Sequence, residues 1–416
     1  MQLHWKIFIA MGAGALVGLL IHPDVHIPGL GWLGPPTTAV FGPLIGPVGE
    51  IFIKLLKMLI VPLVVASIIM GVARVGDVRK LGGLGGRTFA FYILTTFASV
   101  AVGLVMVNII QPGVGGTSLG SVAPDVVHTR VTVGTIILNM VPSNPVDAAA
   151  KGQILPLIVF SILFGAVLTT MGQKAKPLVD FFDSLNEAMM KLTGWIIQLT
   201  PIGVFALIAN VIALTGPGIF ANVGKYMITV IIGLAVHAAI TLPLILWFAG
   251  RAKPHRYAAR VAPALTTAFS TASSSATLPL TIDCVQENAG VSRRVSSFVL
   301  PLGATINMDG TALYESVAAV FIAQLYGIDL SFGQQVLVFL TATLAAIGAA
   351  GIPSAGLVTL AIVLGAVGLP LDGIGMIVAV DRLLDMFRTM VNVWGDATGC
   401  VVVARMEGEE TPAAIR

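Results

Sequence analysis

The amino-acid sequence predicts an all-α, multi-pass membrane protein, and three observations support this prediction. Hydrophobic residues make up 56% of the 416-residue chain, charged residues only 10%, and the mean hydropathy is +0.95, whereas soluble domains carry about 25% charged residues. Apolar segments long enough to cross a bilayer recur along the chain. An interrupted apolar segment followed by a helix with polar residues occurs twice after residue 255, which indicates an internal repeat. The net charge of +3 gives no indication of a nucleic-acid partner.

Six apolar segments account for the first part of the chain, at residues 5–22, 45–73, 88–110, 133–171, 187–214 and 225–249. We expect the fourth to consist of several short pieces, because the sequences at 141–145 and 148–152 interrupt it. The first segment could be a signal peptide, but no small-residue cleavage motif follows it. A first transmembrane helix is therefore the better interpretation. The connections are short and leave no room for a soluble domain.

The basic residues predict the orientation, because cytoplasmic loops carry an excess of lysine and arginine. When the loops are counted alternately from the N-terminus, one side receives Lys6, Arg74, Arg79, Lys80, Arg87, Lys174, Lys176, Arg251, Lys253, Arg256 and Arg260. The other side receives only Arg130, Lys151 and Lys225. The N-terminus is therefore expected to be cytoplasmic.

Two later segments are apolar but interrupted by small and polar residues. The first, at 261–286, breaks at Ser273–Ser275, and the second, at 336–370, breaks at Gly348–Gly356. Basic residues flank the first segment on both sides, which predicts a re-entrant hairpin that enters from the cytoplasmic side. The second has no basic neighbour between Arg294 and Arg382, which favours entry from the outside. The two units are therefore expected to be inverted repeats with a binding site between them.

The helix after the first hairpin contains the sequence TINMDGT at 305–311. A break at Asn307 and Asp309 would free backbone carbonyls at membrane depth, which is tolerable only where they line a site. We favour a monovalent-cation site over a polar kink satisfied by neighbouring helices. Glu315 lies one turn after Thr311 and is the best candidate for a proton carrier, because burial favours the neutral carboxyl group. A structural hydrogen bond is an equally good interpretation of Glu315.

The serines at 273–275 have three interpretations. They could form a flexible hairpin tip, a nucleophile, or a set of hydroxyl and backbone donors for a carboxylate at a helix terminus. The second is disfavoured because no histidine or lysine lies nearby in sequence, and we favour the third. The glycines around Pro353 similarly indicate a hairpin tip that can act as a gate.

The last apolar segment, at about 375–403, contains the most informative pattern. At 3.6 residues per turn, one helix face carries Asp381, Asp385, Arg388, Asn392 and Asp396. A charged residue costs about 2.5–3.5 kcal/mol at the bilayer centre, so this stripe must face protein, water or solute. Arg388 offers a planar fork for a carboxylate, and Asp385 could hold an ammonium group. An internal Arg388–Asp385 salt bridge is the alternative.

Two further features of the sequence have plain structural interpretations. His237 stands alone in an apolar helix, and a structural role is the better interpretation. Cys284 and Cys400 belong to no metal-binding motif, and a structural disulfide is not expected.

The motifs SSSATLP, GATINMDGTALYE, GAAGIPSAG and D-x3-D-x2-RT-x2-N-x3-D together resemble the dicarboxylate/amino acid:cation symporter family. This family contains the excitatory amino-acid transporters and their prokaryotic glutamate and aspartate homologues. The resemblance covers essentially the whole chain and is strongest over 260–400. It implies a homotrimer in the cell (inner) membrane, in contact with membrane lipid, with both termini cytoplasmic. It also implies eight transmembrane helices, two re-entrant helical hairpins and an elevator mechanism.

The domain boundaries follow from the same resemblance. Scaffold helices 1 and 2 would occupy residues 1–86, and scaffold helices 4 and 5 residues 121–222. Transport-domain helix 3 would occupy 87–120. Residues 223–416 would supply helix 6, hairpin 1 (258–291), helix 7, hairpin 2 (332–370) and helix 8.

Residue roles carried over by position assign the substrate site to both hairpins and both polar helices. Its residues would be Ala272, Ser274, Thr311, Ile352, Gly356, Asp385, Arg388, Thr389 and Asn392. Arg388 and Thr311 would bind the side-chain carboxylate, and Asp385 the amino group. Thr389 and Asn392 would bind the main carboxylate.

The resemblance also implies three sodium sites and no organic cofactor. One would use Gly303, Asn307, Asn392 and Asp396. Another would use Tyr92, Thr95, Thr96, Asn307 and Asp309. The third would use carbonyl groups of Thr305, Met308, Ala346, Ile347 and Ala349.

Two positions indicate the substrate class. Members that move C4-dicarboxylates lack the aspartate that Asp385 supplies, and members that move neutral amino acids lack the arginine at 388. L-Glutamate or L-aspartate is therefore the expected substrate, transported with sodium. The alternatives are a C4-dicarboxylate or neutral amino-acid symporter of the same family, or an ion channel. Glu315 resembles the proton-coupling glutamate of the animal transporters, which allows proton co-transport and potassium counter-transport. The chain departs from the family at Ala272 and Met386, where a second arginine is usual; Arg382 is an arginine at a less usual position.

Overall fold

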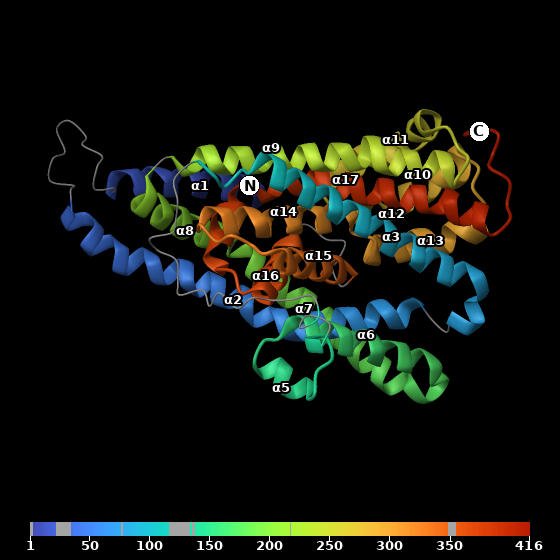
Figure 1. Cartoon of the computed structure of the whole chain (residues 1–416), viewed down its shortest axis with the longest axis horizontal. Coiled ribbons are helices and arrows are strands. Elements are labelled where there is room, and N and C mark those ends of the chain that lie inside the picture. Colours follow the sequence, from blue (N-terminus) through green and yellow to red (C-terminus); the bar gives the residue numbers. More distant parts are fainter. Residues whose placement is uncertain are drawn as a thin grey trace.

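A computed structural model describes residues 3–21, 35–75, 78–115, 134, 138–216, 218–347 and 355–416. Every regular element within these ranges is helical. The helices form two packed groups, each around one long helix (Figure 1). The all-α prediction is confirmed for the described part of the chain.

The first group is built around α2 (Pro35–Val75). It also contains α1 (Leu3–Ile21), α5 (Pro145–Ala150), α6 (Ile154–Thr170), α7 (Lys176–Gln198) and α8 (Thr200–Thr215). Helix α2 packs against α6, α7 and α8, and α1 lies along α8. Glycine permits that close approach, because a β-carbon on Gly14 would lie 2.6 Å from the carbonyl oxygen of Phe205.

The second group surrounds α17 (Ile374–Met406). It contains α3 (Val78–Ile110), α9 (Ile219–Val236), α10 (Leu242–Phe248), α11 (Pro254–Thr271), α12 (Ser274–Asp283), α13 (Arg293–Ile306), α14 (Asp309–Leu325), α15 (Phe332–Ile347) and α16 (Ala355–Val367). Helices α3, α9, α11, α13 and α14 all pack against α17. The helix with the charged stripe is thus the centre of this group.

Three breaks interrupt apolar helices in the second group. Asn307 and Met308 separate α13 from α14, as the sequence predicts. Helices α11 and α12 pack side by side across Ala272 and Ser273, so the turn lies slightly before the predicted Ser273–Ser275. Ser273 has the φ and ψ of an N-cap residue, and its Oγ accepts a hydrogen bond from Ala276 N, which lets α12 start at Ser274. Helices α15 and α16 also pack together, but the predicted tip at 348–354 lies outside the described residues.

Three described helices are long and apolar enough to cross a membrane, at Ile45–Ala73, Gly83–Ile110 and Ile219–Phe248. Helices α7 and α8 add a fourth if their 53° bend lies within one span. The apolar segments predicted at 88–110 and 187–214 are shorter than the corresponding helical regions. Helix α3 starts earlier, at Val78, and α7 starts at Lys176. Hydropathy marks only the apolar part of a helix, whereas the helix continues into a charged first turn.

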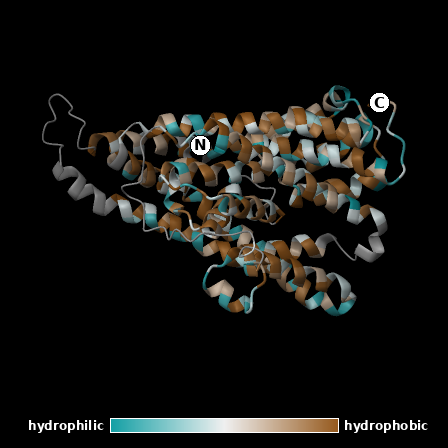
Figure 2. Ribbon diagram, in the orientation of Figure 1, coloured by the Kyte–Doolittle hydropathy of each residue, from teal (hydrophilic) through white to brown (hydrophobic). Residues whose placement is uncertain are grey.

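One end of the molecule gathers several of the segments predicted to be cytoplasmic, but the N-terminus, which precedes Lys6, lies away from this end (Figure 1). The C-terminus, the α10–α11 connection and the α6–α7 connection lie toward this end, and hydrophilic residues are frequent there (Figures 1 and 2). Glu407 just after α17 pairs with Arg87 of α3 at 2.6 Å and with Arg294 of α13 at 3.1 Å. Two of the basic segments, at the starts of α3 and α13, therefore meet at the end of α17.

Candidate functional site

The stripe predicted on the last helix is buried. Asp381, Asp385, Arg388, Asn392 and Asp396 of α17 are each at most 5% exposed. Thr389, the neighbour of Arg388, is equally buried. A row of charges that cannot face lipid therefore faces the interior of the second helix group.

Arg388 is the largest fully buried side chain of the described residues. Its Nη2 lies 2.7 Å from Asp385 Oδ1 and 3.0 Å from Asp381 Oδ1. Its guanidinium carbon lies 3.8 Å from the centre of the Tyr314 ring, which is a cation–π contact. The internal Arg388–Asp385 salt bridge that the sequence left as an alternative is thus present, and Asp381 joins it.

The guanidinium is only partly used by this salt bridge. Nε and Nη1 have no hydrogen-bond partner among the described residues, although both are buried. A buried donor without a partner is costly, so these two atoms indicate an acceptor that the described part of the chain does not supply. A β-carbon on Gly356 would lie 2.8 Å from Nη1, which places the start of α16 directly beside them.

Asn392 and Thr311 meet on the next turn of the stripe. Asn392 Oδ1 accepts a hydrogen bond of 2.7 Å from Gly310 N at the start of α14. Its Nδ2 lies 3.4 Å from Thr311 Oγ1 and 3.2 Å from Met308 Sδ. This contact joins α17 to the break between α13 and α14.

The turn of the first hairpin also reaches α17. Ala272 has a positive φ of 50°, which turns the chain between α11 and α12, and Ser274 is buried at the start of α12. The rings of Phe269 and Phe387 pack edge to face with centroids 5.0 Å apart. The predicted hairpin residues therefore lie near the helix that carries Arg388. Ile352 lies outside the described residues.

Asp309 is held from α3. Its Oδ1 accepts a 2.8 Å hydrogen bond from Thr96 Oγ1, and its backbone oxygen accepts one of 2.7 Å from Ser99 Oγ. Thr96 and Asp309 are more than two hundred positions apart in the chain, as the resemblance implied for one sodium site. The structure brings these two residues together.

Asn307 links the same region to the end of the stripe. Its Nδ2 donates to Asp396 Oδ1 at 2.9 Å, and Thr95 Oγ1 lies 3.4 Å from Asn307 Oδ1. A β-carbon on Gly303 would collide with Asp396 Oδ1 and with the hydroxyl of Tyr92, so a glycine is needed there. The Tyr92 hydroxyl donates to the carbonyl of Val299 at 2.8 Å. Oxygen atoms from three helices thus surround the break in the helix, which is the donor type that a hard cation requires.

The third predicted sodium set is only partly described. Met308 and Ala346 belong to one buried cluster, and α15 packs against α13 and α14. Thr305 and Ile347 lie at the neighbouring ends of α13 and α15. Ala349 lies outside the described residues. No group of three or more histidine, cysteine, aspartate or glutamate side chains in the described ranges could hold a metal ion.

Glu315 is fully buried on α14, two turns after the helix break. Its carboxyl group lies beside Thr359 of α16 and near Arg388. A titratable group in this position lies beside the second hairpin and within electrostatic reach of the charged stripe.

Three contacts in this region are not predicted from the sequence. His237 Nε2 lies 3.3 Å from Asp309 Oδ2, so the lone histidine adjoins the oxygen-rich region formed by Thr95, Thr96, Asn307, Asp309 and Asp396, which we call the candidate cation cluster. Tyr314 stacks on Arg388, and Asp381 pairs with Arg388. Only the isolated position of His237 in an apolar helix could have drawn attention to it.

Long apolar helices, a broken helix and a buried charged centre are together typical of a membrane transporter. Comparison with known proteins then identifies the family. The chain belongs to the sodium:dicarboxylate symporter family, whose sequence profile matches residues 3–406.

Several animal transporters are similar to this chain. Excitatory amino acid transporter 3 of Mus musculus is 43% identical over 415 residues, covering 87% of this chain and 79% of the relative. The putative sodium-dependent excitatory amino acid transporter glt-4 of Caenorhabditis elegans is 41% identical, covering 86% and 82%. Neutral amino acid transporter B(0) of Bos taurus is also 41% identical, covering 84% and 71%. The chain is therefore a multi-pass membrane protein of a transporter family, and an enzymatic role for the serines at 273–275 is not supported.

Proposed function

We propose that this protein is a secondary active symporter that moves acidic amino acids inward with sodium. The observation that carries the proposal is the buried guanidinium of Arg388, which has two donor atoms without a partner among the described residues and lies beside an acidic cluster. Arg388 would bind the side-chain carboxylate of glutamate or aspartate through Nη2 together with Nε or Nη1, because each of these pairs forms a guanidinium fork that matches a carboxylate in two-point geometry. Asp385 would then be released from Arg388 to bind the substrate ammonium group.

The charge balance of the site supports coupling to cations. Five buried carboxyl groups face one buried guanidinium among the described residues, namely Asp309, Glu315, Asp381, Asp385 and Asp396 against Arg388. Burying unpaired charges is costly. Sodium ions at Asp396 and Asp309, and a proton at Glu315, would neutralise this excess. An acidic substrate, which adds further negative charge, would then bind well only after the cations.

The sodium roles follow the oxygen clusters. One ion would use Asp396, Asn392 and carbonyls of Gly303 and Asn307. A second would use Asp309 with Tyr92, Thr95 and Thr96. The third would use the carbonyls between α13 and α15, beside the second hairpin, and would close that hairpin over the substrate.

The mechanism that we propose is an elevator. The group of α1, α2 and α6–α8 would form a trimeric scaffold, and the group around α17 would be the moving transport domain, in which hairpins α11–α12 and α15–α16 are re-entrant. The support is that α2 packs against α6, α7 and α8 within the first group, whereas α17 packs against α3, α9, α11, α13 and α14 within the second. Spin-label distances between α2 and α11 should therefore form two populations whose ratio shifts with sodium and aspartate. One fixed distance under all conditions would contradict the elevator.

Counter-flow in liposomes tests the substrate class. Vesicles loaded with sodium and unlabelled aspartate should exchange labelled aspartate or glutamate, but should not exchange succinate or serine. Preferred exchange of serine would assign the neutral amino-acid class, and preferred exchange of succinate the C4-dicarboxylate class. A flux that does not saturate with substrate would instead indicate a channel.

A further inference from the structure

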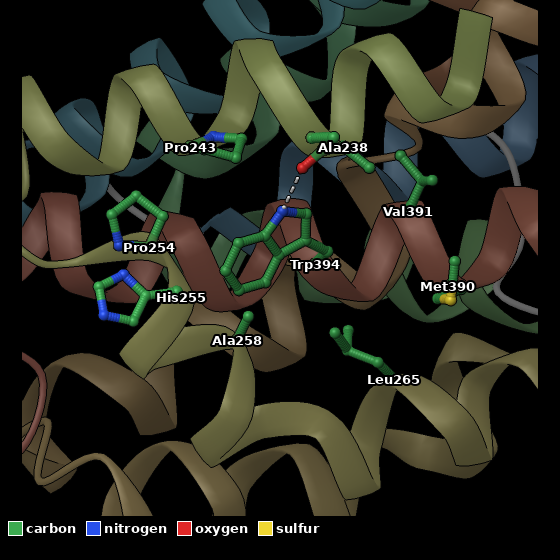
Figure 3. A pocket seen from close by; sticks show the side chains of 10 residues that line it. Ala238, Pro243, Pro254, His255, Ala258, Leu265, Met390, Val391 and Trp394 are labelled. Carbon is green, nitrogen blue, oxygen red and sulfur yellow. Dashed lines mark hydrogen bonds between the residues drawn. The ribbon is translucent and has the colours of Figure 1, made fainter. Parts of the chain in front are cut away.

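An apolar cavity lies on the side of α17 opposite the charged stripe. Its volume is about 410 Å³, which is within the range of ligand pockets. Helix α17 contributes Met390 and Trp394, the α9–α10 helix contributes Ala238 and Pro243, and α11 contributes Ala258 and Leu265 (Figure 3). Met390 and Trp394 are turned about 200° and 240° from Arg388 at 100° per residue, so this cavity is separate from the proposed substrate site.

A second apolar hollow of about 400 Å³ continues the cavity toward the end of α10. The two share Ala239, Pro243, Pro254 and His255, and the second adds Trp247 and Lys253. We call the continuous depression the Trp394 trough. Its outer edge adjoins exposed apolar side chains of α10, where Trp247 is 57% and Phe248 70% exposed. In a membrane protein such a face contacts lipid chains.

The polar end of the trough is basic. Lys253 and His255 line it, and residues 249–260 also contain Arg251, Arg256 and Arg260 but no acidic residue. All five of these side chains are exposed. Basic residues directly beside a membrane-spanning helix attract anionic lipid headgroups. An apolar trough with a cationic end is therefore complementary to an amphiphile with an anionic head.

The wall of the trough is shared with the candidate cation cluster. Helix α9 continues through a π-helical turn, η3 (His237–Thr241). Trp394 Nε1 donates a 3.1 Å hydrogen bond to the carbonyl of Ala238 in this turn (Figure 3). The preceding residue, His237, contacts Asp309 on the other side. A molecule against Trp394 and Ala238 therefore touches the same turn that holds Asp309.

We propose that the Trp394 trough binds an anionic phospholipid, with one acyl chain along Trp394 and the headgroup phosphate at Lys253 and His255. The lipid modulates the cation cluster through η3. The binding claim stands on the trough alone, whereas the modulation rests on the sodium coupling proposed above.

Native mass spectrometry of the purified full chain tests the binding. Phosphatidylglycerol should remain bound in preference to phosphatidylcholine. The Lys253→Gln/His255→Gln double variant should weaken the binding of phosphatidylglycerol about fivefold, because it removes the lysine charge from the trough. Ala258→Trp, which fills the trough, should displace both lipids. The Lys174→Gln/Lys225→Gln variant removes two exposed lysines elsewhere and should behave as the parent protein does.

Equal retention of the two lipids, or no effect of the trough variants, would overturn the proposal. Misfolding of Ala258→Trp would lower its melting temperature. In that case the Lys253→Gln/His255→Gln variant, whose substitutions are on exposed side chains, provides the test of binding. In liposomes, phosphatidylglycerol should change the sodium concentration for half-maximal aspartate uptake in the parent protein but not in the double variant. If the lipid binds but the sodium dependence does not change, the binding site is supported and the proposed coupling through η3 is refuted. If the parent protein takes up no aspartate in liposomes of either lipid, the proposed transport function is contradicted, and the lipid-binding result stands independently.

Discussion

Replacing Arg388 by alanine is the sharpest test of the substrate site. In the proposed complex two donors of the guanidinium bind the substrate carboxylate, and one of them is Nε or Nη1, which have no hydrogen-bond partner among the described residues. A hydrogen bond to a charged group contributes about 1.5–3 kcal/mol, so losing both costs about 3–6 kcal/mol. This corresponds to a rise in the aspartate dissociation constant of roughly 10²–10⁴-fold. Serine, which lacks the second carboxylate, should lose much less affinity.

The same substitution also affects stability. It leaves Asp381 and Asp385 buried without their counter-charge, and breaking a buried pair in this way typically costs about 3–5 kcal/mol. Affinity for both amino acids should therefore be measured by calorimetry on one preparation at saturating sodium. The ratio of the two dissociation constants cancels any loss of folded protein.

Arg382→Ala is the matched control, because Arg382 is a partly exposed arginine 3.9 Å from Asp385 Oδ2. An ion pair of this kind contributes about 0–1 kcal/mol, so its loss should change the aspartate dissociation constant by about fivefold or less. An unchanged ratio of aspartate to serine affinity in Arg388→Ala would refute the role assigned to the guanidinium.

Three further predictions concern the cations and the packing. Thr96→Val removes the hydroxyl that donates to Asp309. It should raise the sodium concentration for half-maximal uptake about fivefold or more. Unaltered sodium dependence would count against a sodium site at Asp309. Glu315→Gln should abolish the difference in uptake between pH 6 and pH 8, and a parent protein without that difference would end the proton proposal. Gly310→Ala should lower the free energy of unfolding by about 1–3 kcal/mol, because its β-carbon would lie 2.6 Å from a carbonyl oxygen of α17. Gly86→Ala, which has open space around it, is the control for a thermal melt.

The sequence predicted those features that depend on local patterns. A spacing of three and four residues was sufficient to place Asp385, Arg388 and Asn392 on one buried face. Polar residues within an apolar run were sufficient to predict the helix break at Asn307. Both follow from what a bilayer does not tolerate, so neither needed knowledge of tertiary contacts.

The sequence did not predict contacts between distant segments from patterns alone. The pairing of Thr96 with Asp309 came from the family resemblance, because two ordinary threonines in an apolar helix carry no signal of their own. The contact of His237 with Asp309 depends on a π-helical turn, which has no signature in hydropathy. Asp381 belonged to the stripe, but its partner could have been any neighbouring polar group. These three contacts are set by packing rather than by sequence period.

Uptake by purified protein in liposomes tests the central proposal most directly. Labelled aspartate should accumulate inside the vesicles when an inward sodium gradient is imposed, because in the proposed mechanism sodium binds at Asp309 and Asp396 before the acidic substrate. Replacing external sodium with choline should abolish this accumulation. Equal uptake in sodium and in choline would contradict it.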